Sequence, residues 1–297
     1  MAAGVSAIVV TFNAMPYIDR SLESVRGHET IVVDHGSTDG TVELVRERFP
    51  DARLVEEENR GLGAGWNRGM VEATGEWFLF LNADAWMADG AVDALLAFAG
   101  SRSDAAIIGP RLRYPDGRLQ RSVRGFPTQW RLATEFYGLR KLGPRTRLFN
   151  SFYANGFDHN EVREVDFVMG ACFLVRSAAV DEVGVLDEGY FLFSEEVDWM
   201  YRFRQAGWTV LFFPGAEAYH VYGASHGGRM FTELVRGHVR FMAKHHGLRA
   251  AERTRRLLRT SLVIRGAVFR GARGQSYRDA ADYLASAPVA TLAGVEA

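Results

Sequence analysis

Apolar runs alternate with segments of helical spacing over the first hundred residues of the chain. The runs are short and rich in β-branched or aromatic residues, and each predicts a strand. They cover residues 7–11, 30–33, 53–55, 77–81 and 105–108. Between them, apolar residues recur three or four positions apart, which predicts helices at residues 16–25, 38–49, 63–73 and 87–98. Apolar strands that alternate with helices indicate an α/β fold with a parallel sheet covered on both faces.

The pattern changes after Pro110. Glycine and proline residues interrupt an arginine-rich stretch as far as Asn160, and a mixed strand and helix region follows. Residues 194–206 form its clearest helix, and from Met230 onward the sequence is mainly helical. We therefore predict three parts, residues 1–110, 111–228 and 229–297.

The amino-acid composition indicates the cellular compartment in which the protein is expected. The chain has 47% apolar and 24% charged residues, as ordinary globular proteins do. Its single cysteine, Cys172, rules out an internal disulfide and suits a reducing environment. The N-terminus does not read as a signal peptide, and no apolar stretch reaches the ~20 residues of a membrane span. The sequence predicts a cytoplasmic protein.

The net charge of −1 conceals two basic blocks. Residues 111–147 hold ten Lys or Arg against two acids, and residues 229–273 hold twelve against two. Such blocks are usually solvated faces, but two in one neutral protein also suggest an anionic partner such as a diphosphate or a lipid headgroup. No nucleic-acid-binding motif accompanies them, so we expect no nucleic-acid partner.

Polar or glycine-rich residues follow three of the predicted strands, at residues 11–13, 34–40 and 82–84. Ligands of parallel α/β sheets bind beyond the carboxyl ends of the strands, so these loops are expected to meet at one cleft. Asp34 could bond a base or ribose, and Asp84 could hold Mg²⁺ or Mn²⁺ together with substrate phosphates. An ordinary turn and a helix cap remain the alternatives.

Three further segments carry candidate chemistry. Residues 58–69 are rich in glycine, and Arg60 and Arg68 could face a diphosphate, although neither a dinucleotide fingerprint nor a P-loop is present. Residues 194–198 place three acids in the first turn of a helix. The acids could complement the helix dipole, or one of them could be a general base whose pKa is raised by its neighbours. His220 follows a strand and could complete a metal site, with His226 nearby.

These segments, in this order, resemble the inverting family-2 glycosyltransferases from Val9 to about His226. The resemblance implies the GT-A fold: a Rossmann-like, mostly parallel central sheet flanked by helices, here with a C-terminal helical extension. It makes residues 1–110 a nucleotide-sugar-binding half and residues 111–228 an acceptor-binding and catalytic half. Residues 229–297 are then a basic helical extension.

The resemblance also implies roles for individual residues. A divalent metal, Mg²⁺ or Mn²⁺, would be held by Asp84, His220 and Asn82, and Glu196 would be the catalytic base, with Glu195 as the alternative. The residues implied to bind the donor are Thr11, Phe12, Asn13, Asp34, Gly36, Ser37, Asn59, Gly61, Asn67, Asn82, Ala83 and Asp84. The residues implied to bind the acceptor are Gly170, Ala171, Asp198, Trp199 and Arg202.

Residues 115–117 and 126–127 are typical of the rhamnosyltransferase-like branch of this family. That branch implies transfer of L-rhamnose from dTDP-rhamnose, with a UDP-sugar as the next choice. The acceptor would be a glycan or a polyprenyl-diphosphate-linked glycan in cell-wall or polysaccharide synthesis. Asn82, Trp66 and Glu196 depart from the usual residues; Trp66 could alter donor preference, and a non-catalytic relative that binds nucleotide-sugar or glycan remains the alternative.

The C-terminal helices leave three alternatives open. Apolar residues from Leu257 to Phe269 largely share one side, with arginines mostly opposite. Such a segment could contact the inner face of an anionic membrane peripherally, pack on its own domain, or form a homodimer.

Overall fold

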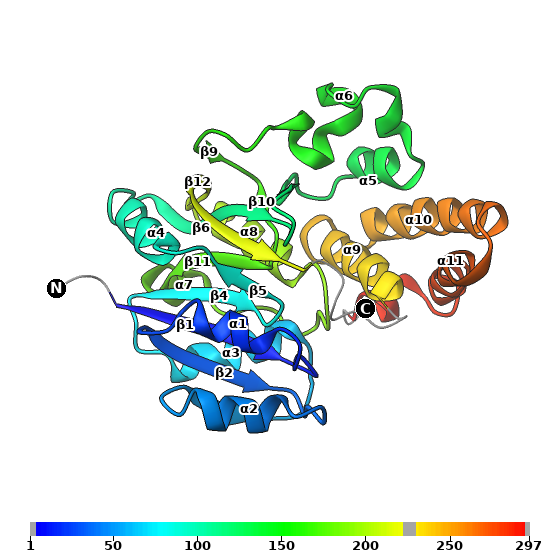
Figure 1. Cartoon of the computed structure of the whole chain (residues 1–297). Coiled ribbons are helices and arrows are strands. Elements are labelled where there is room, and N and C mark those ends of the chain that lie inside the picture. Colours follow the sequence, from blue (N-terminus) through cyan, green and yellow to red (C-terminus); the bar gives the residue numbers. More distant parts are fainter. Residues whose placement is uncertain (1–3, 222–229, 295–297) are drawn as a thin grey trace. The chain divides into compact units, whose positions relative to one another are not determined.

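The computed structural model in Figure 1 describes residues 4–221 and 230–294. The chain divides into two compact units. The first unit comprises residues 1–123, 158–188 and 199–225, and the second comprises residues 124–157, 189–198 and 226–297. The predicted division into three functional parts stays a prediction.

The first unit is built on a ten-stranded sheet in the described residues. Its main path runs β3-β2-β1-β4-β11-β6-β12-β5, and the first four of these strands are parallel. Antiparallel β11 separates β4 from β6, whereas β6 and β12 are parallel. The strands of this path are β1 (Val5–Thr11), β2 (Glu29–Asp34), β3 (Arg53–Glu56), β4 (Trp77–Asn82), β5 (Ala85–Met87), β6 (Ala105–Arg113), β11 (Cys172–Arg176) and β12 (Thr209–His220). The predicted α/β fold with a mostly parallel sheet is confirmed.

Helices flank this sheet as predicted, and short strands extend it. The helices are α1 (Ile18–Glu23), α2 (Thr41–Arg48), α3 (Leu62–Glu72), α4 (Ala91–Gly100), α7 (Ser177–Val183) and the greater part of α8 (Glu195–Gln205). The short strands are β7 (Leu119–Gln120) and β9 (Arg163–Glu164), which pair with β6 and β12. Two more two-residue strands are β8 (Val123–Arg124) and β10 (Phe167–Val168).

Trp66 belongs to the core of the first unit. It is fully buried on α3, with its ring edge-on to Phe80 at 5.3 Å and to Phe173 at 5.4 Å between centroids. Phe80 and Phe173 stack on each other at 5.0 Å. Such aromatic contacts add to the burial of a large apolar area. Trp66 therefore stabilises the sheet, which corrects the expectation that it tunes donor preference.

The glycines of α3 bring the helix close to the sheet. A Cβ on Gly69 would lie 2.3 Å from Cγ2 of Ile8, and one on Gly65 would lie 2.7 Å from Nε2 of His35. Gly61, with φ of 106°, precedes the helix. The glycine-rich segment therefore forms a regular helix whose spacing permits close packing, so its glycines do not indicate a diphosphate loop.

The second unit is helical in its described part. It contains α5 (Gln129–Phe136), η1 (Leu139–Leu142), α6 (Arg147–Asn150), η2 (Ser151–Gly156), α9 (Met230–His246), α10 (Leu248–Val268), α11 (Gly271–Tyr283), α12 (Val289–Ala293) and the first turn of α8. The predicted C-terminal helical extension is confirmed. Among the described residues, no helix has both the length and the hydropathy needed to cross a membrane.

The apolar side predicted for the C-terminal helices is divided in the structure. Leu258 and Leu262 are buried, whereas Ile264 and Val268 are 51% and 68% exposed. Helix α10 therefore buries one apolar face in the second unit and exposes other apolar residues near its C-terminal end.

Candidate active site

The loops that follow β1 and β2 are bonded to each other. The backbone N–H of Thr38 donates to Oδ1 of Asn13 at 2.8 Å, and the N–H of Asn13 donates to Oγ of Ser37 at 2.8 Å. Asn13 has a φ of 51°, a left-handed conformation that asparagine tolerates. The structure thus joins two of the three predicted strand-end loops.

Asp34 shapes its own loop. Its carboxylate accepts hydrogen bonds from the N–H groups of Gly36 at 3.0 Å and Ser37 at 2.8 Å, and from Oγ of Ser37 at 2.5 Å. The side chain is almost completely buried. Asp34 therefore holds the turn at Gly36, and its predicted contact with a base or ribose stays a prediction. Phe12 beside it is 50% exposed.

The end of β4 lies beside β1 and against the predicted acceptor turn. Val10 pairs with Asn82, and the N–H of Asn82 donates to the carbonyl of Ala171 at 3.0 Å. The segments 82–84 and 170–171 are therefore adjacent in one unit, although their predicted ligand contacts stay predictions.

Asp84, His220 and Gln120 form a buried group in the first unit. Nδ1 of His220 lies 2.9 Å from Oε1 of Gln120, and Nε2 lies 3.4 Å from Oδ1 of Asp84. All three residues are at most 5% exposed. Nδ1 of the His220 ring therefore faces the Gln120 amide, and Nε2 faces the Asp84 carboxylate.

This group fits a divalent cation. A carboxylate oxygen and an imidazole nitrogen are suitable ligands for Mn²⁺ or Mg²⁺, and an acceptor on the other ring nitrogen fixes the required tautomer. Within the described residues, no three His, Cys, Asp or Glu side chains gather closely enough to hold a metal. Asp84 and His220 lie together, and the assignment of Asp84, His220 and Asn82 as metal ligands stays a prediction. Gln120 was missed, since no sequence pattern indicated its two-residue strand.

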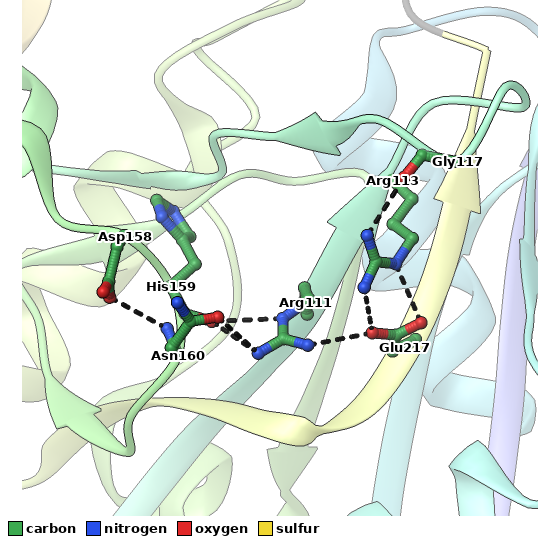
Figure 2. Close-up of polar contacts among 7 residues, drawn as sticks. All are labelled: Arg111, Arg113, Gly117, Asp158, His159, Asn160 and Glu217. Atoms are coloured by element: carbon green, nitrogen blue, oxygen red, sulfur yellow. Dashed lines mark hydrogen bonds and ion pairs between the residues drawn. The ribbon is translucent and has the colours of Figure 1, made fainter.

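An ion-pair network fixes the strand that carries His220 (Figure 2). The register of β12 against β6 shifts between Phe213 and Glu217. Immediately after the shift, Glu217 accepts from Arg111 at 3.0 Å and from Arg113 at 2.7 and 2.9 Å. The hydrogen bonds from Arg113 are the largest cause of the lowered pKa of Glu217. Three residues further, His220 pairs with Ala85 of β5, the neighbour of Asp84.

The same network explains part of the first basic block. Arg111 also donates to the carbonyl of His159 at 2.8 and 3.1 Å, and Figure 2 shows it between His159 and Glu217. Arg111 and Arg113 are therefore engaged inside the first unit, so their charges do not indicate an anionic partner.

The candidate base lies in the second unit, after a strained turn. Phe193 and Ser194 have φ values of 66° and 70°, which are unfavourable for residues with a side chain and are frequent at functional sites. Glu195 is 2% exposed; burial, followed by the charge of Glu196, raises its pKa well above the usual value. Glu196 is half-buried. Neighbouring carboxyl groups with different environments can divide acid and base roles.

The three other predicted acceptor residues bond within the protein, and their assignment to the acceptor stays a prediction. Asp198 is fully buried and bonded to Nζ of Lys244 at 2.9 Å and Nε2 of His245 at 2.7 Å. Trp199 is fully buried, and its indole N–H donates to the carbonyl of Gly184 at 2.8 Å. Arg202 donates to the carbonyls of Val183 at 3.1 Å and Val185 at 2.7 Å.

Two predicted donor residues are likewise structural. The amide of Asn67 donates to the carbonyl of Leu186 and to Glu188, each at 3.0 Å, and accepts from the N–H of Leu186 at 3.0 Å. The side chain of Asn59 accepts from the N–H of Gly61 at 3.1 Å. The Asn67 amide thus bonds through both its nitrogen and its oxygen, and the Asn59 amide bonds through its oxygen, while their donor assignments stay predictions. Residues 222–229, which include His226, lie outside the described residues.

Comparison with known proteins agrees with this arrangement. The profile described as "Glycosyl transferase family 2" matches residues 6–184. The chain is 30% identical over 292 residues to the N-acetylglucosaminyl-diphospho-decaprenol L-rhamnosyltransferase of Mycobacterium tuberculosis, covering 90% of this chain and 94% of that protein. It is 24% identical to the glycosyltransferase AglE of Haloferax volcanii, over 80% of this chain and 71% of the relative.

Solved structures share the fold at low sequence identity. The mannosyltransferase PcManGT of Pyrobaculum calidifontis, in complex with GDP-Man and Mn²⁺, has a TM-score of 0.58 at 18% identity and covers 100% of this chain and 89% of its own. GalNAc-T7, solved with UDP, GalNAc and Mn²⁺, has a TM-score of 0.58 at 18% identity over 81% of this chain and 47% of its own. The predicted GT-A fold is confirmed, and the chain belongs to glycosyl transferase family 2 as a glycosyltransferase.

Proposed function

We propose that this glycosyltransferase transfers L-rhamnose from dTDP-rhamnose to a lipid-linked N-acetylglucosamine during cell-wall or polysaccharide synthesis. The observation that carries the proposal is the 30% identity to the mycobacterial rhamnosyltransferase over nearly the full length of both chains. The name of that relative specifies L-rhamnose and an N-acetylglucosaminyl-diphospho-lipid. The diphosphate donor follows from the branch that the sequence resembles, with a UDP-sugar as the alternative.

On the donor side, Asp84 and His220 would hold a divalent cation. When bound, the cation would supply positive charge that stabilises the departing diphosphate. Gln120 lies 2.9 Å from Nδ1, the other ring nitrogen of His220, and the ion pairs of Glu217 fix the strand that carries His220. The linked loops after β1 and β2 would receive the nucleotide through Phe12, Asn13 and Gly36.

On the acceptor side, Glu196 would remove the proton of the acceptor hydroxyl. The freed oxygen attacks the anomeric carbon from the face opposite the diphosphate, and the bond to the diphosphate oxygen breaks as the new glycosidic bond forms. This single displacement inverts the anomeric configuration. Burial raises the pKa of Glu195 and so favours the protonated form of that carboxyl group.

A donor titration tests the proposal directly. The purified protein is titrated calorimetrically with dTDP-rhamnose, UDP-glucose and GDP-mannose, first with Mn²⁺ or Mg²⁺ and then with EDTA. We expect dTDP-rhamnose to bind most tightly, and chelation to weaken its binding, because Asp84 and His220 would hold a cation whose charge attracts the diphosphate. Preference for a UDP-sugar would replace the donor assignment. Binding of none of them by folded protein would favour a non-catalytic relative.

The exposed face of α10 supports contact with an anionic membrane. Arg249, Arg253 and Arg259 are exposed and make no ion pair within the part of the chain described here. Beyond them, Val263 and Ile264 are 52% and 51% exposed. A cationic segment followed by exposed aliphatic side chains suits a surface of anionic headgroups, where the lipid part of the acceptor would reside.

Vesicle flotation tests this contact. Vesicles with 30 mol% phosphatidylglycerol are expected to bind the protein, and Arg249→Gln, Arg253→Gln and Arg259→Gln together should weaken partitioning on the order of 100-fold, at about 1 kcal/mol per cation. The charge-matched control replaces Arg46, Arg48 and Arg53 of the first unit with glutamine. Equal losses in both triple variants, or no binding to anionic vesicles, would exclude this face as the contact.

A further inference from the structure

Helix α9 supports the segment that carries the candidate base. Both belong to the second unit, which includes residues 189–198 and all of α9. The supporting residues of α9 are Arg236, Gly237, Arg240 and Lys244. Positions 236, 240 and 244 are four apart and position 237 is three before 240, so all four lie on one side of the helix. Positions 236 and 240 contact the start of the segment, position 237 lies against residues 193–194, and position 244 contacts Asp198.

The first contacts hold the start of the segment. A guanidinium N–H of Arg236 donates to the carbonyl of Gly189 at 3.2 Å. The guanidinium of Arg240 lies 5.2 Å from the ring centroid of Tyr190. A Cβ on Gly189 would lie 2.0 Å from a guanidinium nitrogen of Arg240, so only glycine permits this approach.

The next contact lies beneath the strained turn. A Cβ on Gly237 would lie 2.7 Å from Oγ of Ser194 and 3.0 Å from the carbonyl oxygen of Phe193. The absence of a side chain at Gly237 therefore lets α9 pack directly against the two residues with positive φ. Residues in such conformations persist only where the surrounding structure holds them in place.

The last contacts hold the first turn of α8. Asp198 is fully buried, and its two carboxylate oxygens are bonded to Lys244 and His245 at 2.9 and 2.7 Å. The N–H of Asp198 donates to the carbonyl of Ser194 at 2.9 Å and so closes the turn that contains Glu195 and Glu196. A buried carboxylate bonded in this way to two donors is fixed in position.

We infer that α9 positions the base-bearing turn, and that Lys244 and His245, acting through Asp198, are positioning residues for the reaction. This inference rests on the proposed function, because it assigns the turn its role through Glu196. Neither residue touches the reacting atoms in this account. They keep the backbone of residues 195–198 in the first turn of α8, so that the Glu196 carboxylate keeps its direction.

Hydrogen exchange tests the positioning without any substrate. In Lys244→Met, the amides of residues 193–198 should exchange faster than in the unmodified chain, because the first turn of α8 loses a bond that holds it. Lys141→Met is the matched control: Lys141 is exposed in the same unit and makes no ion pair within the described residues. Unchanged protection of residues 193–198 in Lys244→Met would overturn the inference.

Kinetics then connect the turn with the base. Lys244→Met is expected to lower kcat about 10- to 100-fold while the Kd of the nucleotide-sugar stays unchanged, since misplacement of a catalytic group has such effects. Lys244→Arg, which keeps a donor for Asp198, should restore part of the loss. His245→Gln should act in the same direction as Lys244→Met.

A double-mutant cycle separates positioning from general damage. In a Glu196→Gln background, Lys244→Met should lower kcat little further, because the group that it positions is already absent. A full additional loss would overturn the inference. Normal turnover of Glu196→Gln together with faster exchange in Lys244→Met would instead overturn the proposed function and leave the structural support intact.

Discussion

Glu196→Gln is expected to lower kcat by about 10²–10⁴, the range that a general base contributes. Glutamine keeps the size and most hydrogen bonds of the side chain but cannot accept the proton of the acceptor hydroxyl. The Kd of the nucleotide-sugar should stay close to that of the unmodified enzyme, since the base acts on the acceptor. The measurement is the initial rate of transfer to a synthetic N-acetylglucosaminyl-diphospho-lipid at saturating donor.

Glu195→Gln is the control that separates the two carboxyl groups. Burial raises the pKa of Glu195, so its neutral form is favoured, and glutamine is a neutral residue of nearly the same shape. This variant should therefore keep most of its turnover. A larger loss in Glu195→Gln than in Glu196→Gln would make Glu195 the base. Normal rates in both variants, or a product of retained anomeric configuration by NMR, would end the single-displacement proposal.

The sequence predicted those strands whose formation depends on hydrophobic spacing within a short stretch of the chain. Strands β1, β2 and β4 and the helices after them arise from consecutive βα units, so short-range hydrophobic spacing suffices to predict them. Strand β11 is different. It enters between β4 and β6, antiparallel to both, and its Leu174 pairs with Leu79 and Ile108, which lie 95 and 66 positions earlier in the chain. Its pairing depends on contacts that no local pattern contains.

The same difference between local and long-range contacts separates the site residues whose positions were predicted from those whose bonds were not. The loops at Asn13 and Asp84 follow predicted strands and lie where the sequence placed them. Asn67 and Asp198 occupy positions that the family resemblance assigned to ligands, yet their side chains bond to Leu186 and Lys244, 119 and 46 residues away. Polar residue types alone cannot distinguish a ligand contact from a long-range structural bond.

The first basic block suggested an anionic partner because the acid that neutralises part of it lies far along the chain. Arg111 and Arg113 stand in a block of ten basic residues, and the acid that pairs with both, Glu217, lies more than 100 positions later. Gln120 is the opposite case, a residue of the site that no sequence feature indicated. It has no charge and no motif, but its side chain contacts Nδ1 of His220 while Nε2 faces Asp84, and so helps to orient the ring. The structure was needed to identify it as part of the site.

Asp84→Asn is expected to abolish metal-dependent donor binding. The carboxylate is the anionic protein ligand proposed for the cation, and a cation's stabilisation of diphosphate charge is worth several kcal/mol, so the Kd in Mn²⁺ should rise at least about 100-fold. Gln120→Leu should have a smaller effect of about 10–100-fold on Mn²⁺ affinity, because it removes only the acceptor that orients His220. Asp93→Asn, an exposed acid in the first turn of α4, is the matched control.

Mn²⁺ binding is followed by electron paramagnetic resonance of the free ion, and donor binding by calorimetry with and without EDTA. The order of affinities tests the geometry as well as the ligand: the unmodified chain and Asp93→Asn should bind equally, Gln120→Leu more weakly, and Asp84→Asn least. If Gln120→Leu bound Mn²⁺ normally while Asp84→Asn did not, the cation would use Asp84 without needing the contact by which Gln120 orients His220. Equal donor affinity in all four proteins, insensitive to EDTA, would instead mean that the buried pair of Asp84 and His220 stabilises the sheet edge and holds no metal.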